Sequence, residues 1–274
     1  MTEHLSIIAD AENLMVNIMS KNDSSHDHHH VFRVVRNSLH IAKHEGITDI
    51  DTMEVIHLSA LLHDLYDSKY ENDGTEYGLI HELFEKHSYP MEKRLRVLHV
   101  LKHIGYKDEL KQIEKECDMI NIKIMRESPN RNPFYLYGGI GISDEMLEKR
   151  SYDLSNISRP MFIKKNPLFH TDELCVVQDA DRLDAVGGIG IARCFWFSAL
   201  HQGQIHEKGT NDPNIVNADE YLLNQGKKGS IATMHFKEKL FRLSYLMKTK
   251  TGREMADGRM GIMHDIITAI ENEW

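Results

Sequence analysis

Four side chains with donor atoms for a divalent cation fall in three separate helical stretches: His30, the adjacent pair His63 and Asp64, and Asp181. Two imidazoles and two carboxylates suit an octahedral Mn²⁺, Mg²⁺, Fe²⁺ or Co²⁺ that keeps positions open for water and substrate oxygens. A cation held in this way commonly assists hydrolysis. These residue types therefore indicate a metal-dependent hydrolase.

The His-Asp dipeptide alone is weak evidence, because it occurs at residues 26–27, 63–64 and 264–265. The middle pair differs in its context. It ends the apolar run 55–62, which is typical of a buried helix. Two adjacent ionisable groups at such a place need a partner, and a shared cation satisfies both. The alternative is a helix end at which both side chains meet solvent.

Three motifs, in order along the chain, resemble those of the HD-superfamily metal-dependent phosphohydrolases. They occupy residues 25–34, 60–65 and 177–185. Four further segments resemble the YpgQ/YedJ-like subgroup of that superfamily: residues 187–195, 234–240, 248–249 and 251–253. The likeness covers 26–107 and 174–265, and it implies an all-α HD-domain helical bundle with a helical or loop insertion before the last metal-ligand helix.

The resemblance also implies a metal site with one divalent cation per chain. Mn²⁺ or Mg²⁺ is the first choice, and Co²⁺, Ni²⁺ and Fe²⁺ are other candidates. His26 is an alternative ligand to His30, although the His-x-x-Arg-Val context favours His30. The four implied ligands are His30, His63, Asp64 and Asp181.

A second metal is not expected. Some superfamily members use extra histidines for one, but the spacing of His87, His99 and His103 fits no such pattern. A di-iron oxygenase built on this helical site would likewise need more ligands than the sequence offers.

Two carboxylates are candidates for general acid/base catalysis. Asp67 lies one helical turn beyond Asp64 and can share its face. In the superfamily, an acidic residue here can assist water activation or protonate the leaving oxygen. Asp184, one turn past Asp181, is the second choice. Both can instead be surface or supporting carboxylates.

Near the first motif, Arg33 follows His30 by three residues and can reach the same site, where a guanidinium suits a substrate phosphate. His26 and Asp27, one turn before His30, resemble residues that support the site or form its wall. Together with Arg33, they are the candidate substrate-binding residues in this half of the chain.

The net charge of −9 argues against general nucleic-acid binding. The charge is uneven, however, because nine Lys or Arg and three acids lie in residues 226–259. A basic segment in an acidic protein suits a phosphorylated small molecule. Lys239 and Arg253 are the candidates there, because they fall in the subgroup-like stretch. For most of the others a solvated helix face is the better reading.

Apolar residues recur at helical spacing through most of the chain, and no long alternating pattern favours a sheet. One helix is expected over 31–42, with Gly46 as its stop. Another is expected around 236–247, ending at Gly252. Three isoleucines give the last helix its expected buried edge: Ile262, Ile266 and Ile270.

A glycine cluster follows the closing motif at Gly187, Gly188 and Gly190. Each glycine inside a helix costs about 1 kcal/mol relative to alanine. The cluster predicts either a close approach of two helices or a break just past the ligand, and close packing is the favoured interpretation.

The chain is expected to form a single HD-type domain over 1–274, with residues 108–173 as an insertion or lid. Three cysteines, an odd number, make a disulfide framework improbable. No apolar stretch has the length of a membrane span, and the first residues lack the pattern of a signal peptide, so a cytoplasmic location is expected. A homodimer is the default assembly.

The resemblance implies nucleotide phosphate chemistry. The leading version is hydrolysis of (deoxy)nucleoside triphosphates to monophosphate plus pyrophosphate by a metal-activated water. A nucleoside 5′-monophosphate phosphatase or an alarmone hydrolase would use the same metal site. A non-catalytic HD nucleotide-binding protein is an alternative from another class, but such a protein would lack a ligand, and the motifs retain all four.

Overall fold

A computed structural model describes residues 2–21, 23, 27–65, 75–106, 109, 171–208 and 231–274. Within these ranges the regular elements are helices, and the β pairing is an isolated parallel bridge between Gln204 and Ile231. The expected all-α class is confirmed. The predicted insertion, 108–173, lies almost wholly outside the described residues and stays a prediction, as does the single-domain organisation.

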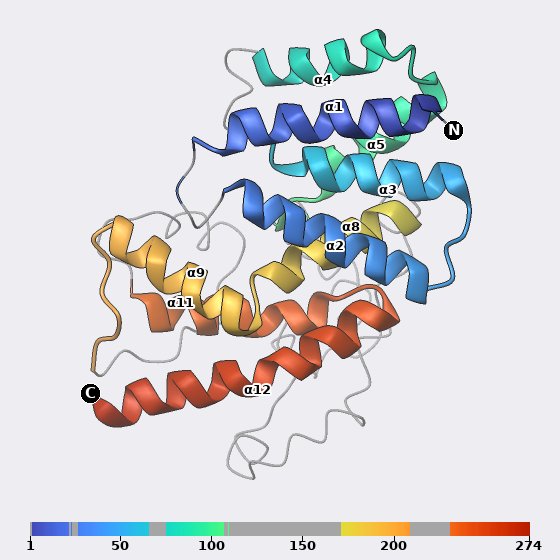
Figure 1. Cartoon of the computed structure of the whole chain (residues 1–274). Helices are drawn as coiled ribbons and strands as arrows, with labels where there is room; N and C mark the ends of the chain where they lie inside the picture. Colours follow the sequence, from blue (N-terminus) through green and yellow to red (C-terminus); the bar gives the residue numbers. More distant parts are fainter. Residues whose placement is uncertain are drawn as a thin grey trace, which may run out of the picture.

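The described helices follow one another as an α-helical array with two short 3-10 helices, η1 and η6 (Figure 1). In chain order they are α1 (Thr2–Met19), α2 (His28–His44), α3 (Ile50–Leu62), η1 (His63–Leu65), α4 (Thr75–Lys86), α5 (Met91–His103), α8 (Asp172–Asp184), α9 (Gly187–Leu200), α11 (Ala232–Glu238), η6 (Leu240–Leu246) and α12 (Lys250–Glu273).

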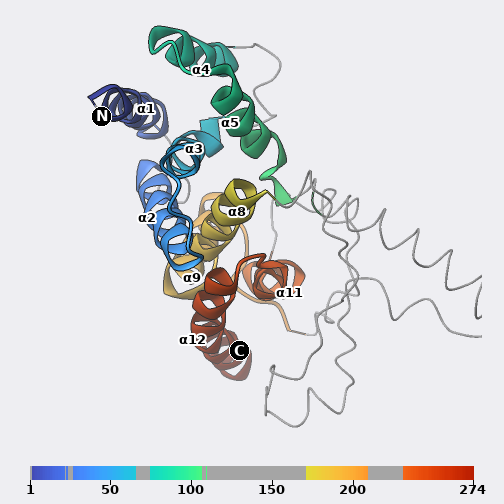
Figure 2. The ribbon, with the colours of Figure 1, turned by 90° about the vertical axis from the view of Figure 1, so that its right-hand side faces the viewer.

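Helix α8 is central and contacts α2, α3, α5, α9 and α12. Figure 2 shows it surrounded by these neighbours. The Thr171 side chain caps its start by accepting a hydrogen bond from the Leu174 amide. Most of its residues are buried, including the polar Gln178, Asp179 and Asp184. A central helix with buried polar groups needs internal partners for them, and these partners build the site.

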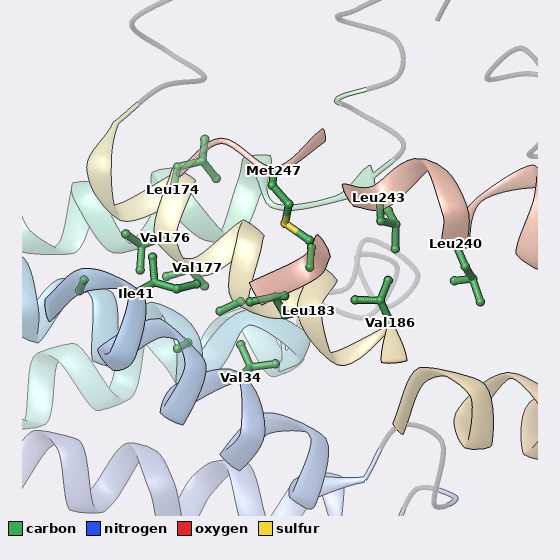
Figure 3. Packing of buried hydrophobic residues seen from close by; sticks show 14 of the residues in the cluster. Val34, Ile41, Leu174, Val176, Val177, Leu183, Val186, Leu240, Leu243 and Met247 are labelled. Atoms are coloured by element: carbon green, nitrogen blue, oxygen red, sulfur yellow. The ribbon is translucent and has the colours of Figure 1, made fainter. Parts of the chain in front are cut away.

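Two hydrophobic clusters hold the bundle together. The first joins α2, α3, α8, α11, η6 and α12, and Figure 3 shows residues such as Val34, Leu183 and Met247 packed within it. The second joins α1, α3, α4 and α5 and includes Phe84. Helix α3 contributes to both, with Ile56 in the first and other residues in the second. The end of α3, where η1 begins, is therefore fixed from two sides.

The predicted helix around 31–42 is confirmed as α2. Asp27 caps its start by accepting a hydrogen bond from the His30 amide, and the helix ends before Gly46, which has a φ of 80°. This left-handed conformation favours glycine and explains the stop.

The prediction of one helix from about 236 to Gly252 is wrong. Helix α11 ends at Glu238, η6 follows, and Gly252 lies in the first turn of α12. A Cβ atom on Gly252 would lie 2.6 Å from Asp179 Oδ2, so glycine is required here for close approach to α8. Gly252, which we interpreted as the end of a helix, therefore lies at the start of one and permits its close packing.

The expected buried edge of α12 is wrong for two of its three isoleucines, whereas Ile270 is partly buried and packs against the first cluster. Ile262 and Ile266 are 52% and 38% exposed, while Met263 and Ile267 are buried. The apolar stripe is offset by one residue, a shift of about 100° around the helix. Because apolar residues stand side by side at 262–263 and at 266–267, sequence spacing alone did not define the buried face.

No single helix among the described residues is long and apolar enough to cross a membrane. Helices α8 and α9 meet the length and composition test only as a pair, and the chain bends by 66° between them.

Candidate metal centre

Three elements bring the predicted ligands together. His30 lies in the first turn of α2, His63 and Asp64 lie in η1 at the end of α3, and Asp181 lies on α8. The two imidazoles are almost fully buried, whereas the Asp64 and Asp181 side chains are 30% and 37% exposed. The histidines therefore form the inner side of the centre, and the carboxylates border on solvent.

The donor atoms converge on one small volume. His30 Nε2 lies 3.3 Å from His63 Nε2, 3.3 Å from Asp64 Oδ2 and 3.4 Å from Asp181 Oδ1. His63 Nε2 lies 3.3 Å from Asp64 Oδ1. Ligand atoms of His30, His63 and Asp181 all fall within 4.8 Å of one another, so a single ion could bind all three. The Asp64 carboxylate lies against both imidazoles but is not part of this group of three.

The Nδ1 atoms of the two rings fix which nitrogen faces the centre. His30 Nδ1 lies 2.7 Å from Asp184 Oδ2, and His63 Nδ1 lies 2.9 Å from the Ala60 carbonyl oxygen. Both partners are acceptors, so each Nδ1 carries a proton and donates it. In the neutral rings, the two Nε2 lone pairs then face each other beside two carboxylates. This donor set fits a divalent cation, and supporting hydrogen bonds at Nδ1 are typical of metal-ligating histidines.

The carboxylates around His30 are negatively charged and favour a positive charge between them. Burial lowers the pKa of His30, but hydrogen bonds to Asp181, Asp184 and Asp64 outweigh burial and raise this pKa well above its ordinary value. Burial raises the pKa of Asp181, but its hydrogen bond to His30 and the charge of His63 lower it overall. A proton or a metal cation can therefore supply the charge that the carboxylates require.

Asp184 lies on the opposite side of the His30 ring from the other three ligands. Its carboxylate is buried and accepts hydrogen bonds from Arg33 Nε at 2.6 Å, Arg33 Nη2 at 2.9 Å and Arg193 Nη1 at 2.8 Å. Burial raises the pKa of Asp184, but the hydrogen bonds to His30 and Arg33 lower it well below its ordinary value. This position favours orientation of His30 over the acid/base role considered for Asp184 from the sequence.

Two predicted residues, Asp67 and His26, lie outside the described residues. Asp27 is described and caps α2. It lines a surface hollow of about 490 Å³ together with Arg33 and three neighbours on α2: His29, Phe32 and Arg36. Arg33 thus contacts the metal centre by way of Asp184 and also lines this hollow on the surface.

The two substrate-binding candidates in the basic segment, Lys239 and Arg253, have different surroundings. Burial lowers the pKa of Lys239 overall, while the negative charge of Asp181, a proposed ligand, acts in the opposite direction. Its Nζ also lies 5.1 Å from the centre of the Tyr106 ring. Arg253 Nη1 donates to the carbonyl oxygens of Met247 and Lys248 instead. Arg253 therefore supports the start of α12.

Sequence reasoning missed Asp179 and Arg193. Asp179 accepts hydrogen bonds from the backbone amides of Lys248 and Thr249 and from the Thr249 hydroxyl, and so fixes α12 to α8. Arg193 bonds the carboxylate behind His30. Both lie within or next to the closing motif, but a carboxylate that binds backbone amides has no spacing signature in the sequence.

No family model matches the chain. It is 25% identical over 259 residues to YpgQ of Bacillus subtilis (strain 168), a match that covers 93% of this chain and 88% of YpgQ. These values come from sequence alone.

Solved structures share the fold. A protein of Lactobacillus plantarum matches with a TM-score of 0.65 at 20% identity, covering 98% of this chain and 97% of that one. An HD-superfamily hydrolase of Bacillus thuringiensis matches with a TM-score of 0.59 at 21% identity, covering 99% and 98%. Bacillus subtilis YpgQ in complex with ADP matches with a TM-score of 0.56 at 21% identity, covering 96% and 97%. The chain thus has the all-α fold of an HD-superfamily hydrolase and is similar to YpgQ along nearly its whole length.

Proposed function

We propose that this protein is a divalent-metal-dependent phosphohydrolase that cleaves (deoxy)nucleoside triphosphates to monophosphate and pyrophosphate. The observation that carries the proposal is the convergence of His30, His63 and Asp181, with Asp64 against both imidazoles and both Nε2 atoms directed inward. The hydrolase fold and the ADP complex of YpgQ support it. Mn²⁺ or Mg²⁺ is the proposed cation, and the cytoplasmic location and homodimer stay predictions.

In this proposal the four side chains hold one cation. When bound, the cation would activate a water molecule and neutralise charge that develops on phosphoryl oxygens. Asp64 and Asp181 stand at the solvent side, so a substrate phosphate can approach there without displacing the buried histidines. The hydrogen bond from His63 Nδ1 to Ala60 keeps its Nε2 directed inward during turnover.

Two further residues complete the proposed chemistry. Lys239 lies in the electrostatic field of Asp181, where its ammonium would bind a phosphate oxygen of the substrate. Asp67 is proposed as the acid/base that assists the water or the leaving oxygen, on the grounds of its place three residues beyond Asp64 in the sequence.

The test is a product-resolved hydrolysis screen. The protein is stripped of metal, refilled with Mn²⁺ or Mg²⁺, and offered nucleoside mono- and triphosphates and their deoxy forms. Asp64→Ala serves as the blank, because it removes one proposed ligand from the solvent side. Pyrophosphate released from triphosphates by the wild type and not by the variant is the expected result.

Other outcomes would redirect or overturn the proposal. Orthophosphate released from monophosphates would identify a nucleotidase that uses the same centre. Equal turnover in Asp64→Ala would overturn the site assignment. Metal and nucleotide binding without any hydrolysis would favour the non-catalytic nucleotide-binding alternative.

A further inference from the structure

We infer that Arg193 is a positioning residue for the metal centre: through Asp184 it fixes the orientation of His30, and the glycine-rich turn between α8 and α9 places it there. The inference rests on the proposed metal site. It assigns a role to a residue on α9, a helix that contributes none of the four proposed ligands.

Arg193 and His30 bond the same oxygen atom. Arg193 Nη1 donates to Asp184 Oδ2 at 2.8 Å, and His30 Nδ1 lies 2.7 Å from that oxygen. Arg193 Nη1 also lies 3.2 Å from the backbone carbonyl oxygen of Asp184. The guanidinium therefore holds both the carboxylate and the backbone of this residue. Arg33 bonds the carboxylate from α2 and completes its coordination.

The arginines determine how the carboxylate can act on His30. A buried carboxylate, 3% exposed here, is costly unless cationic partners compensate it. Held as an anion by two guanidinium groups, Asp184 can only accept a hydrogen bond. His30 must then carry its proton on Nδ1 and present the Nε2 lone pair to the other ligands. Arg193 thus acts on the ligand through Asp184, without touching the proposed cation.

The turn before α9 determines where Arg193 lies. Helix α8 ends at Asp184 and α9 begins at Gly187, which has a φ of 77° and lies against the Arg259 side chain. A Cβ atom on Gly190 would lie 2.2 Å from the Ala185 carbonyl oxygen. Gly190 therefore permits α9 to fold tightly onto the end of α8. Arg193, three residues later, lies on the same side of the helix and meets Asp184.

Both interpretations of the glycine cluster considered from the sequence, a helix break and close packing, hold in the structure. The helix that carries Asp181 does not continue through the glycines but breaks after Asp184. Close packing of two helices occurs as well, because Gly187 of α9 lies against Arg259 and Met263 of α12, while Gly190 lies against the turn that precedes α9. The cluster builds the turn through which one arginine reaches the carboxylate behind a ligand.

The test measures metal affinity apart from activity. Mn²⁺ dissociation constants are determined by competition with a chromophoric chelator for the wild type, Arg193→Met, Arg193→Lys and Asp64→Ala. Thermal unfolding of each metal-free protein shows that it is folded. Loss of a residue that supports a ligand typically weakens metal binding by about 10- to 100-fold. We expect such a loss in Arg193→Met, and partial recovery in Arg193→Lys, which restores a cation.

A matched pair of glycine variants tests the turn. Gly190→Ala forces a Cβ atom against the Ala185 carbonyl oxygen, whereas Gly188→Ala meets no atom within 4 Å. Both substitutions add one methyl group to α9 within its first turn. We expect weaker Mn²⁺ binding in Gly190→Ala and wild-type affinity in Gly188→Ala.

The outcomes separate this inference from the proposed function. Wild-type Mn²⁺ affinity in a folded Arg193→Met, with binding lost in Asp64→Ala, would overturn the positioning role and leave the metal site intact. Failure of the wild type to bind Mn²⁺ would overturn the metal site and the positioning role together. An equal loss in Arg193→Met and Arg193→Lys would also contradict the inference if both metal-free proteins unfold at markedly lower temperatures than the wild type, because the arginine would then be a stabilising residue only.

Discussion

His30 and His63 face each other through their Nε2 atoms at 3.3 Å, while the Nδ1 atom of each ring bonds an acceptor on its far side. Two neutral imidazoles in this arrangement direct lone pairs at each other, and two carboxylates add negative charge. The arrangement is unfavourable without a positive charge between the ligands. A cation bound between the ligands would remove this unfavourable arrangement and so stabilise the folded protein.

Metal binding should therefore stabilise the fold through this centre. A ligand that binds only the native state adds about 2.7 kcal/mol to the free energy of unfolding at a concentration of 100 times its dissociation constant. We expect Mn²⁺ to raise the melting temperature of the wild type. His63→Ala and Asp64→Ala should lose both this increase and turnover.

The measurement is thermal unfolding with and without Mn²⁺, combined with elemental analysis of the purified protein. His44→Ala, at an exposed position on α2, is the control for loss of a histidine as such. Full metal content in His63→Ala would contradict the assignment, and two irons per chain would overturn the expectation of a single metal.

Substitutions of Lys239 and Arg253 should have different kinetic effects, although the sequence suggested substrate binding for both residues. Lys239 lies in the field of Asp181, so Lys239→Met should raise KM for a nucleotide more than it lowers kcat, as expected for a residue that holds a remote phosphate. Arg253 donates to two backbone carbonyl oxygens, so Arg253→Met should leave KM unchanged and lower stability by about 1 kcal/mol.

Steady-state kinetics and urea unfolding of the two variants check this distinction. A loss in kcat alone for Lys239→Met would move Lys239 from substrate binding to the chemical step. A raised KM in Arg253→Met would show that its guanidinium reaches the substrate despite its backbone partners.

The convergence of the proposed ligands could be expected from the sequence, because each lies in a motif that resembles one of the HD superfamily. His30, His63 and Asp181 lie far apart in the chain, and the structure brings their donor atoms within 4.8 Å. The helical class could also be predicted, since periodicity of apolar residues reports on it directly.

The sequence left a supporting role for Asp184 as one of several alternatives, but it could not predict which atoms the supporting residues contact, because these contacts depend on directions in space. Asp184 follows Asp181 by three residues, yet its carboxylate reaches the opposite side of His30. Gly190 acts through a contact with the backbone of Ala185, and a glycine in a sequence does not reveal which atom it approaches. The exposed Ile262 is a further example. The residues one position later, Met263 and Ile267, are equally apolar, so the sequence did not show which of the two faces of α12 is buried.

Asp179 should contribute strongly to stability. It is fully buried and accepts hydrogen bonds from the Lys248 amide at 2.9 Å, the Thr249 amide at 2.7 Å and the Thr249 hydroxyl at 2.8 Å. Asp179→Ala would leave these donors without an acceptor in a buried place. We expect a loss of about 3 kcal/mol in the free energy of unfolding, because each buried unsatisfied group costs about 1–3 kcal/mol.

Urea unfolding of Asp179→Ala measures this loss. Asp257→Ala is the matched control, because Asp257 is exposed on α12, and such changes usually stay within about 0.5 kcal/mol. Equal stability of the two variants would contradict the role of Asp179 in fixing α12 to α8.

His235 should make the fold less stable in mild acid. Burial, with a further effect from the charge of Lys239, lowers the pKa of His235 from 6.5 to about 4. The unfolded chain therefore takes up a proton at this residue as the pH falls below 6.5, while the folded protein does not. Stability is full above pH 6.5 and decreases toward pH 4, because a proton bound only by the unfolded state favours unfolding. The loss attributable to this group is about 2 kcal/mol at about pH 5, since one pKa unit corresponds to about 1.4 kcal/mol.

Urea unfolding of the metal-free protein at about pH 7 and about pH 5 measures this effect, and comparison with His235→Gln removes the contributions that other groups share. The decrease in stability between the two pH values should be smaller in His235→Gln than in the wild type. His44→Gln, at an exposed histidine, should retain the full decrease. The same decrease in all three proteins would mean that His235 is protonated in the folded state at mildly acidic pH. In that case the buried site of His235 must accommodate a positive charge in addition to that of Lys239. The burial of this histidine argues against such a charge.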